Sequence, residues 1–130
     1  MKKIVIDGNN FSNEEEFYTE IDKLLTKGLT WKTGHNLDAF NDILSGGFGI
    51  HEYGEELEII WLNASKSKSN LGYNETVKHW ENILKRCHQS NIEYVNKKYL
   101  DAKNQIGDTL FDIIIDIILD NDNCRLTIKE

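Results

Sequence analysis

Polar and apolar residues alternate at the start of the chain and then recur at helical spacing. Residues 2–7 show the two-residue period of a half-buried strand. From Ser12 to Gly28 the apolar residues instead recur every three to four positions, and Glu15 stands three residues after Ser12, which is the spacing of a capping box. The pattern therefore predicts a strand followed by an amphipathic helix.

The next amphipathic segment follows Gly34. Asn36 is suited to accept a hydrogen bond from a backbone N–H of a first helical turn. After it, Leu37, Phe40 and Leu44 recur at i, i+3 and i+7. These positions predict a short helix with one apolar face, which ends at the glycine-rich stretch that follows. The rest of the chain is interpreted around this central helix.

Two further apolar strands and several helices are predicted downstream. Continuous apolar strands that alternate with helices are typical of a parallel sheet covered by helices, which places the chain in the α/β class. Polar residues and glycine after the second strand indicate an exposed loop. The expected elements are a strand at 57–62, an exposed loop at 63–73, a helical hairpin at about 74–105, a helix at 110–119 and a strand at 124–128.

The segment 110–119 is apolar enough to form either a buried strand or a buried helix. Asp112, Asp116 and Asp120 recur every four residues, so a helix places all three along one edge and leaves its other sides apolar. A strand would place the three carboxylates on one side beside isoleucines. We therefore predict a helix, and the sheet then has three parallel strands.

The helical hairpin at about 74–105 is expected to lie within a single domain that comprises residues 1–130, because the elements on both sides of it need each other's apolar faces. Its first helix places Val77, Trp80 and Leu84 on one stripe. Stripes at helical spacing usually pack against a core, which favours extra cover for the sheet. A second binding surface is the alternative interpretation.

The polar face of the central helix carries two carboxylates, Asp38 and Asp42, at the i, i+4 spacing. Like charges at this spacing destabilise a helix by about 0.2–0.5 kcal/mol. No basic residue on that face offsets them, and an unfavourable local choice without compensation is typical of a functional surface. The alternative is a solvated face on which the helix dipole favours Asp38 in the first turn.

The overall charge restricts the classes of partner. The chain of 130 residues has 22 Asp and Glu residues against 15 Lys and Arg residues, which gives a formal net charge of −7. Such a field repels phosphate backbones and attracts basic proteins. We therefore expect no direct binding to nucleic acid, and no membrane partner is expected either.

Cysteine usage and the start of the chain indicate the compartment. Cys87 and Cys124 lack the spacing of metal ligands, and we interpret them as buried free thiols in a reducing cytosol. The short apolar run after Met1 is too short for the core of a signal peptide. The expected location is cytoplasmic.

Candidate catalytic patterns are weak. Four histidines are scattered along the chain, and the sequence contains neither a paired-cysteine motif, nor a nucleophile elbow, nor a phosphate-binding glycine loop. His35, Asp38 and Asp42 are the residues that a metal site would use, which leaves a metal-dependent hydrolase as an alternative. The favoured expectation is a protein that is not an enzyme and that holds no metal and no cofactor.

The central helix contains a recognisable pattern. Gly34 is followed by Asn36-Leu37-Asp38-Ala39, and then by Asp42 and Leu44. Together with the first strand at 2–8 and the last strand at 124–128, this pattern resembles the barstar family, the intracellular inhibitors of the secreted ribonuclease barnase. The resemblance implies a small three-stranded parallel sheet packed with helices. It also makes the hairpin an insertion relative to the compact form of the family.

The resemblance implies a protein that blocks the basic active-site cleft of a ribonuclease with an acidic helix, as a bacterial immunity protein or antitoxin does. A cleft that binds RNA phosphates needs Lys, Arg and His, and carboxylates on a rigid helix can take the place of the phosphates. The expected partner is a basic ribonuclease or nuclease toxin, and the chain is expected to be a monomer before the complex forms. The alternative is an acidic docking module for a basic partner that is not a nuclease.

The candidate partner-binding residues lie on or near the central helix and on the last helix. By resemblance, Asp38 and Asp42 carry the contact, and an acid of the last helix, Asp116 or Asp120, joins them. Trp31 is either a core anchor or a contact residue, and its large aromatic ring favours the core. The full set is Trp31, Lys32, Thr33, His35, Asp38, Asn41, Asp42, Ser45, Asp116 and Asp120.

Overall fold

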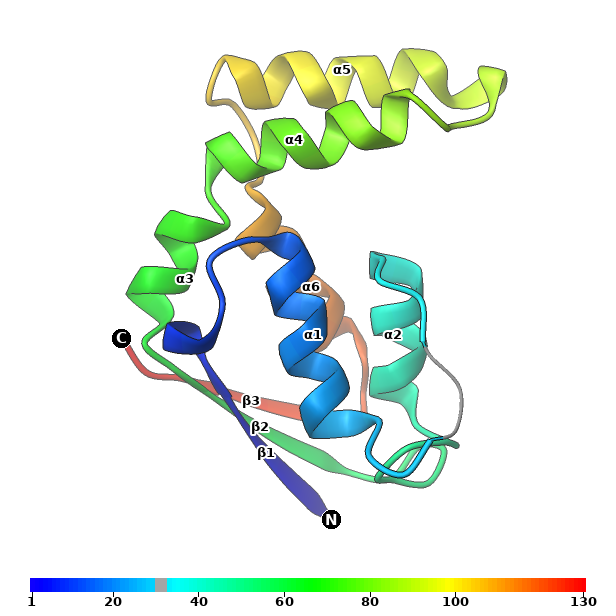
Figure 1. The fold of residues 1–130 in the computed structure, drawn as a ribbon, viewed down its shortest axis with the longest axis vertical. Helices are drawn as coiled ribbons and strands as arrows, with labels where there is room; N and C mark the ends of the chain where they lie inside the picture. The colour runs from blue at the N-terminus through cyan, green and yellow to red at the C-terminus, as the bar shows by residue number, and fades with distance from the viewer. Residues whose placement is uncertain (30–32) are drawn as a thin grey trace.

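The computed structural model describes residues 1–29 and 33–130. Trp31 and Lys32, two of the predicted partner-binding residues, lie outside this described part. Figure 1 shows the strands at the bottom, helices α1, α2 and α6 above them, and helices α4 and α5 across the top. We call α4, α5 and the turn between them, residues 73–103, the helical arm, and the rest of the molecule the body.

The sheet has three parallel strands in the order β1-β2-β3. They are β1 (Lys2–Asp7), β2 (Leu57–Leu62) and β3 (Cys124–Ile128). Ile59 of the central strand pairs with Ile4 on one side and with Leu126 on the other. The structure confirms the predicted α/β class and the three-stranded parallel sheet.

The helices connect these strands in the way that parallel pairing requires. In chain order, the helical elements are η1 (Gly8–Asn10), α1 (Glu14–Leu25), α2 (Leu37–Ser45), α3 (Ala64–Asn70), α4 (Tyr73–Leu84), η2 (Gln89–Asn91), α5 (Ile92–Lys103) and α6 (Leu110–Asp120). Figure 1 shows α1, α2 and α6 on the same face of the sheet. The central helix of the sequence analysis is therefore α2, which belongs to this layer.

Aromatic rings occupy the centre of the core between the sheet and its helices. Phe17 of α1 stacks on Trp61 of β2 with ring centroids 5.8 Å apart, and it meets Phe40 of α2 edge to face at 5.3 Å. Phe111 of α6 also contacts Trp61 edge to face, at 5.3 Å. All four side chains are buried. Such pairs stabilise a core beyond their buried area, and here they fix α2 against α1.

The start of α1 differs by one residue from the prediction based on Ser12 and Glu15. Asn13 is the N-cap, and its side-chain oxygen accepts a hydrogen bond from the backbone N–H of Glu16 at 2.8 Å. The Glu16 carboxylate accepts a hydrogen bond from the backbone N–H of Ser12 at 2.8 Å. Asparagine caps a helix as well as serine does, so two adjacent caps compete and the local pattern does not decide between them.

The prediction of an exposed loop at 63–73 is wrong, because most of this segment forms α3. Ala64 and Ser67 are buried on its inner side. The Ser67 hydroxyl accepts a hydrogen bond from the indole N–H of Trp61 at 3.0 Å. Contacts with the core therefore stabilise a helix whose composition alone is that of a loop.

The hairpin predicted at about 74–105 corresponds to α4 and α5, which lie side by side (Figure 1). The arm joins the body at the start of α6, where the backbone N–H of Leu110 donates to the Thr76 hydroxyl at 2.6 Å. Trp80 is only half-buried, with its ring edge-on to that of Tyr94 at 6.4 Å. The predicted apolar stripe thus packs mainly within the arm and is not a cover for the sheet.

Ser90 and Glu93 have the sequence spacing of a capping box, which predicts a helix start at Ser90, but no such box forms. The helix α5 begins at Ile92, and its N-cap Asn91 makes no side-chain hydrogen bond to the helix. Ser90 belongs to η2, and its backbone N–H donates to the Nδ1 atom of His88 at 3.1 Å. The chain therefore enters α5 through a short 3-10 turn, a local variant that the capping pattern does not distinguish.

The segment 110–119 is helical, as the spacing of its aspartates predicts. Thr109 and Asp112 form a capping box, in which each side chain accepts a hydrogen bond from the backbone N–H of the other residue. Asp112, Asp116 and Asp120 are all exposed. The sequence therefore allows a correct choice between helix and strand here.

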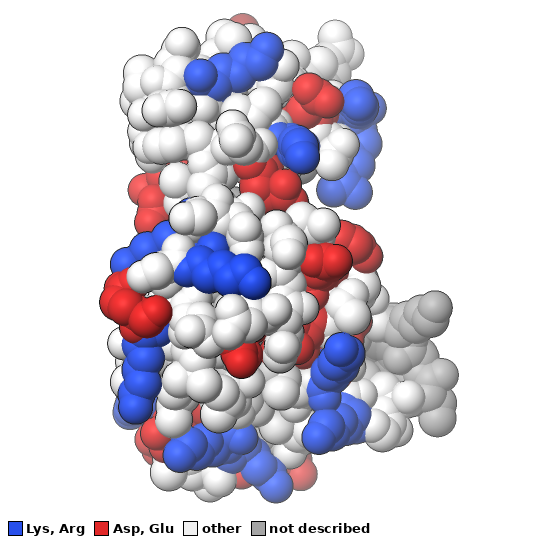
Figure 2. Space-filling view, turned by 60° about the vertical axis from the view of Figure 1, so that its left-hand side comes forward, with Lys and Arg blue, Asp and Glu red and all other residues white. Residues whose placement is uncertain are grey.

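Charge is distributed unevenly between the arm and the body. The arm has six Lys and Arg residues and four Asp and Glu residues, whereas the whole chain has 15 and 22. Figure 2 shows, at its right-hand edge, basic side chains of the upper part above acidic side chains of the lower part, with a hollow between them. The negative excess of the chain therefore belongs to the body.

Candidate partner-binding site

The helix α2 has one buried face and one exposed face. Phe40, Ile43 and Leu44 are buried in the core. At its start, the Asn36 side-chain oxygen accepts a hydrogen bond from the backbone N–H of Ala39 at 2.8 Å, as predicted. The cap and the buried face together fix the helix, which then presents its polar face at a constant position.

The C-terminal end of α2 is fixed as well. Gly46 follows the helix with a φ of 87°, and a Cβ atom there would lie 2.3 Å from the carbonyl oxygen of Glu52. Only glycine fits both the angle and the close approach. The buried His51 ring also bonds to the carbonyl oxygen of Leu44 through Nε2 at 3.0 Å. The loop after α2 is thereby tied back to the helix.

The two predicted acids of α2, Asp38 and Asp42, are exposed. Within the part of the chain that the structure describes, neither carboxylate takes part in a hydrogen bond or an ion pair. Their mutual repulsion is therefore uncompensated in the folded protein, as the sequence indicates. The two carboxylates are available to a cationic partner.

His35 and Thr33 clamp the entry to α2 against α1. The two ring nitrogens of His35 bond to the carboxylates of Glu15 and Asp22, the second at 2.7 Å. The Thr33 hydroxyl donates to the other oxygen of Asp22 at 2.6 Å. The structure thus gives His35 two carboxylate partners on α1, in place of the Asp38 and Asp42 of the metal-site alternative. Among the described residues, no group of His, Cys, Asp and Glu is suited to hold a metal ion.

This clamp predicts a pH-dependent contribution to stability. Burial by itself lowers the pKa of His35, but the hydrogen bonds and charges of Glu15 and Asp22 outweigh it and raise the pKa above the ordinary value of 6.5. Because the pKa is raised in the folded state, the stabilising contribution is complete below pH 6.5 and is lost as the pH rises through the pKa of the folded protein.

We expect the difference in thermal midpoint between the wild type and a His35→Ala variant to be largest near pH 6 and to shrink towards about pH 9. Thermal unfolding followed by circular dichroism at a series of pH values measures this difference. In an Asp22→Asn background this difference in thermal midpoint should vary less with pH, because one of the two charges that raise the pKa of His35 is removed. A difference that stays constant with pH would contradict the clamp.

The other predicted residues gather at the opposite end of α2. The Asn121 amide donates to the side-chain oxygen of Asn41 at 2.8 Å, and the Ser45 hydroxyl donates to the side-chain oxygen of Asn121 at 3.2 Å. Asp120 and Ser45 line a small hollow of about 390 Å³. Asp116 is exposed on α6 and does not line this hollow. Of the two acids predicted on the last helix, the structure therefore brings Asp120 next to α2.

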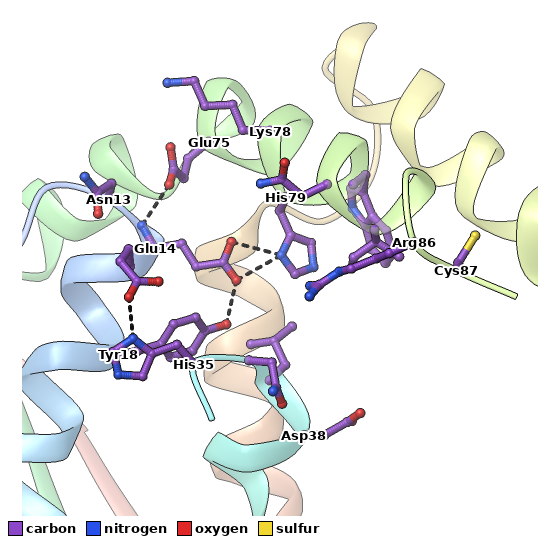
Figure 3. A pocket seen from close by; sticks show the side chains of 16 residues that line it. Asn13, Glu14, Tyr18, His35, Asp38, Glu75, Lys78, His79, Arg86 and Cys87 are labelled. Carbon is purple, nitrogen blue, oxygen red and sulfur yellow. Dashed lines mark hydrogen bonds and ion pairs between the residues drawn. The ribbon is translucent and has the colours of Figure 1, made fainter. Parts of the chain in front are cut away.

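A larger cleft, with a volume of about 1030 Å³, opens at the N-terminal end of α2 (Figure 3). Asp38 belongs to its lining, whereas Asp42 does not. The opposite wall, the α4 wall, is formed by the helix α4 and the turn after it, with Lys78 and His79 on the helix and Arg86 in the turn. The first predicted acid thus lies at the cleft, and the second lies outside it on the open surface of α2.

A partly buried carboxylate joins the arm to α1 at the back of this cleft (Figure 3). Glu14 accepts hydrogen bonds from the Tyr18 hydroxyl and from Nδ1 of His79, the latter at 2.9 Å. Burial alone raises the pKa of Glu14, but the hydrogen bond and charge of His79, the Tyr18 hydroxyl and the charge of Arg86 together outweigh it, so the pKa of this carboxyl lies below its ordinary value. Glu14 therefore stays ionised at neutral pH and holds α4 at the start of α1.

Sequence reasoning missed Glu14, Tyr18 and His79. The contact between Glu14 and His79 spans 65 residues, so no local pattern indicates it. The i, i+4 spacing of Glu14 and Tyr18 is the one signal in the sequence, and it is too common to be informative.

The two cysteines are free thiols in different surroundings. Cys124 is buried, as predicted, and burial raises its pKa to about 11. Cys87 is only half-buried and lines the cleft, so the prediction of a buried thiol is wrong for this residue. The thiol of Cys124 is therefore unreactive at neutral pH while the protein is folded.

A comparison with protein families identifies the fold and its general role. The model of barstar, the barnase inhibitor, matches residues 1–105. The chain belongs to the barstar family. This match confirms the family predicted from the pattern in α2, and members of this family are inhibitors and not enzymes. No curated protein and no solved structure matches the chain at a significant level.

The barstar match runs from β1 through α5, so it includes the arm. The interpretation of residues 74–105 as an insertion within a single domain of residues 1–130 stays a prediction. Among the residues that the structure describes, no helix is both long enough and apolar enough to cross a membrane.

Proposed function

We propose that this protein is an intracellular inhibitor of a basic ribonuclease, with the role of an immunity protein or antitoxin. The observation that carries the proposal is the exposed face of α2 in a chain of the barstar family. On this face Asp38 and Asp42 are exposed and have no partner within the described residues. An inhibitor of this kind catalyses no reaction and needs neither metal nor cofactor.

The geometry of α2 supports a block by charge mimicry. A cleft that cleaves RNA holds cationic side chains to bind phosphates, and carboxylates on a fixed helix can form charge-assisted hydrogen bonds to the same groups. The helix is fixed at its start by Asn36 and beneath by Phe40, so little conformational freedom is lost when it binds. The net charge of −7 favours fast encounter with a basic nuclease.

The test is an inhibition assay with purified proteins. We expect RNA cleavage by the target nuclease to fall in proportion to the added chain and to stop at an equimolar ratio. The panel begins with barnase, because it gives the family its description, and continues with other basic ribonucleases. The chain alone should show no hydrolase activity with or without divalent metal ions.

Two outcomes would support other functions. Tight binding to a basic protein without any loss of RNA cleavage would favour an acidic docking module. Metal-dependent turnover that disappears in a His35→Ala variant would favour a hydrolase and overturn the proposal.

A further inference from the structure

We propose that the helical arm forms a second wall of the partner-binding site, so that a segment of the ribonuclease enters the cleft between α2 and α4. This inference rests on the proposed function and extends it to residues of α4 and of the turn that follows it. Lys78 and Arg86 are assigned as contacts for a carboxylate of the ribonuclease, while Asp38 on the opposite wall contacts one of its cations.

The first support is that the two walls enclose the same space. Asp38 lines the cleft together with Lys78 and Arg86, so a molecule that reaches the N-terminal end of α2 also meets α4 (Figure 3). The volume of about 1030 Å³ lies at the upper limit of about 1,000 Å³ for small-molecule sites. The cleft therefore has room for several side chains of a protein segment.

The second support is the distribution of paired and unpaired charges in the cleft. Glu14 is paired with His79, Glu15 with His35, and Glu75 accepts a hydrogen bond from the backbone N–H of Glu14 at 2.7 Å. These three acids, two on α1 and one at the start of α4, are therefore used within the protein, and all three line the cleft.

The remaining charges of the lining form no ion pair among the described residues, although the charge of Arg86 contributes to lowering the pKa of Glu14. Asp38, Lys78 and Arg86 are all exposed, and the described part of the chain provides no ion pair for any of them. The unpaired charges are thus negative on the α2 wall and positive on the α4 wall. An occupant that matches them carries a cation towards α2 and an anion towards α4.

The third support is a buried polar atom beside Arg86. His79 is only 7% exposed, and its Nε2 atom has no hydrogen-bond partner among the described residues. Figure 3 shows this ring next to the Arg86 side chain, with its other nitrogen turned to Glu14. Buried polar atoms in native proteins almost always have a partner, and a bound segment that shifts the neighbouring Arg86 side chain would reach this atom and supply one.

A ribonuclease fits this pattern better than a uniformly basic partner does. Its active site combines cations that bind phosphates with groups for general acid–base catalysis, and where these groups include a carboxylate, both signs of charge occur close together on its surface. The α4 wall then adds selectivity, because a nuclease with a cation opposite Arg86 would be repelled.

The experiment compares two charge reversals on neighbouring residues. Arg86→Glu places a negative charge on the cleft wall. Lys85→Glu makes the same type of change next to it, on a residue that does not line the cleft. Both variants make the chain more acidic, and this change in net charge by itself should strengthen binding to a basic nuclease. We expect the Kd of Arg86→Glu to rise at least about tenfold and that of Lys85→Glu to change less than about twofold.

The measurement is the Kd, by calorimetry, for the ribonuclease that the wild-type chain inhibits in the panel that begins with barnase. Arg86→Ala and Asp42→Ala are measured alongside, and thermal midpoints report folding. If Asp42→Ala weakens binding while both Arg86 variants bind like the wild type, the α4 inference is wrong and the proposed function stands. If the wild-type chain binds no member of the panel, both are wrong.

Discussion

The Asp42→Ala variant is expected to bind its ribonuclease at least about 2 kcal/mol more weakly than the wild type, with an unchanged or slightly higher thermal midpoint. Asp42 lies in the second turn of α2, too far from the N-terminus for the dipole to stabilise it, and it repels Asp38. Its removal relieves this repulsion in the free protein. In the complex, the same change leaves cations of the nuclease desolvated and unpaired. Stability and affinity should therefore move independently.

The matched control is Asp108→Ala, which removes an exposed acid between α5 and α6, away from both α2 and the cleft. It should change affinity only through net charge, and this small effect should vanish at high salt. Asp38→Ala should weaken binding as Asp42→Ala does, with a small loss of stability because the first-turn carboxylate is gone. Unchanged affinity in both α2 variants would show that α2 is not the inhibitory element.

The second large effect is expected for Phe40→Ala, which should lower the free energy of unfolding by about 3–5 kcal/mol. Phe40 is 1% exposed, and its ring meets that of Phe17 at 5.3 Å. The truncation removes the main contact of α2 with the aromatic core and leaves a cavity beneath the helix. Chemical denaturation followed by fluorescence measures the loss.

Tyr53→Ala is the control for this change, because Tyr53 is 81% exposed and its loss should cost little. If Phe40→Ala were as stable as Tyr53→Ala, α2 would not be held by the core in the way described above. The Phe40→Ala variant also tests whether the fixed position of α2 contributes to binding. A loosened α2 should bind the nuclease more weakly even though Asp38 and Asp42 are intact.

The fold could be predicted where local periodicity and packing agree. The strand β1 and the helix α2 have alternating and helical patterns that coincide with their buried faces, β2 is nearly all apolar, and Asn36 makes the cap that its position predicts. The helix α3 could not be predicted, because only Ala64 and Ser67 face the interior of an otherwise polar segment. Its stabilising bond from Trp61 depends on the folded sheet.

The candidate site, like the fold, could be predicted only where local patterns determine it. Exposure of Asp38 and Asp42 follows from the helical pattern of α2 itself. The partners of His35, in contrast, lie 20 and 13 residues earlier on α1, and only the packing of α1 against α2 brings them together. The position of the α4 wall depends on the contact between Glu14 and His79, which are 65 residues apart in the sequence. No local pattern therefore indicates what the hairpin does.

The arm is attached to the body mainly by polar contacts. Thr76 bonds to Leu110, His79 bonds to Glu14, and the Tyr73 hydroxyl donates to the carbonyl oxygen of Gly107 at 2.7 Å. In the described part of the chain, no arm residue belongs to the core cluster of the body. Segments with few buried apolar contacts open at a lower free energy than the rest, as separate cooperative units. We therefore expect the arm to be a separate unit of local unfolding, with amide hydrogens that exchange with solvent before those of the sheet.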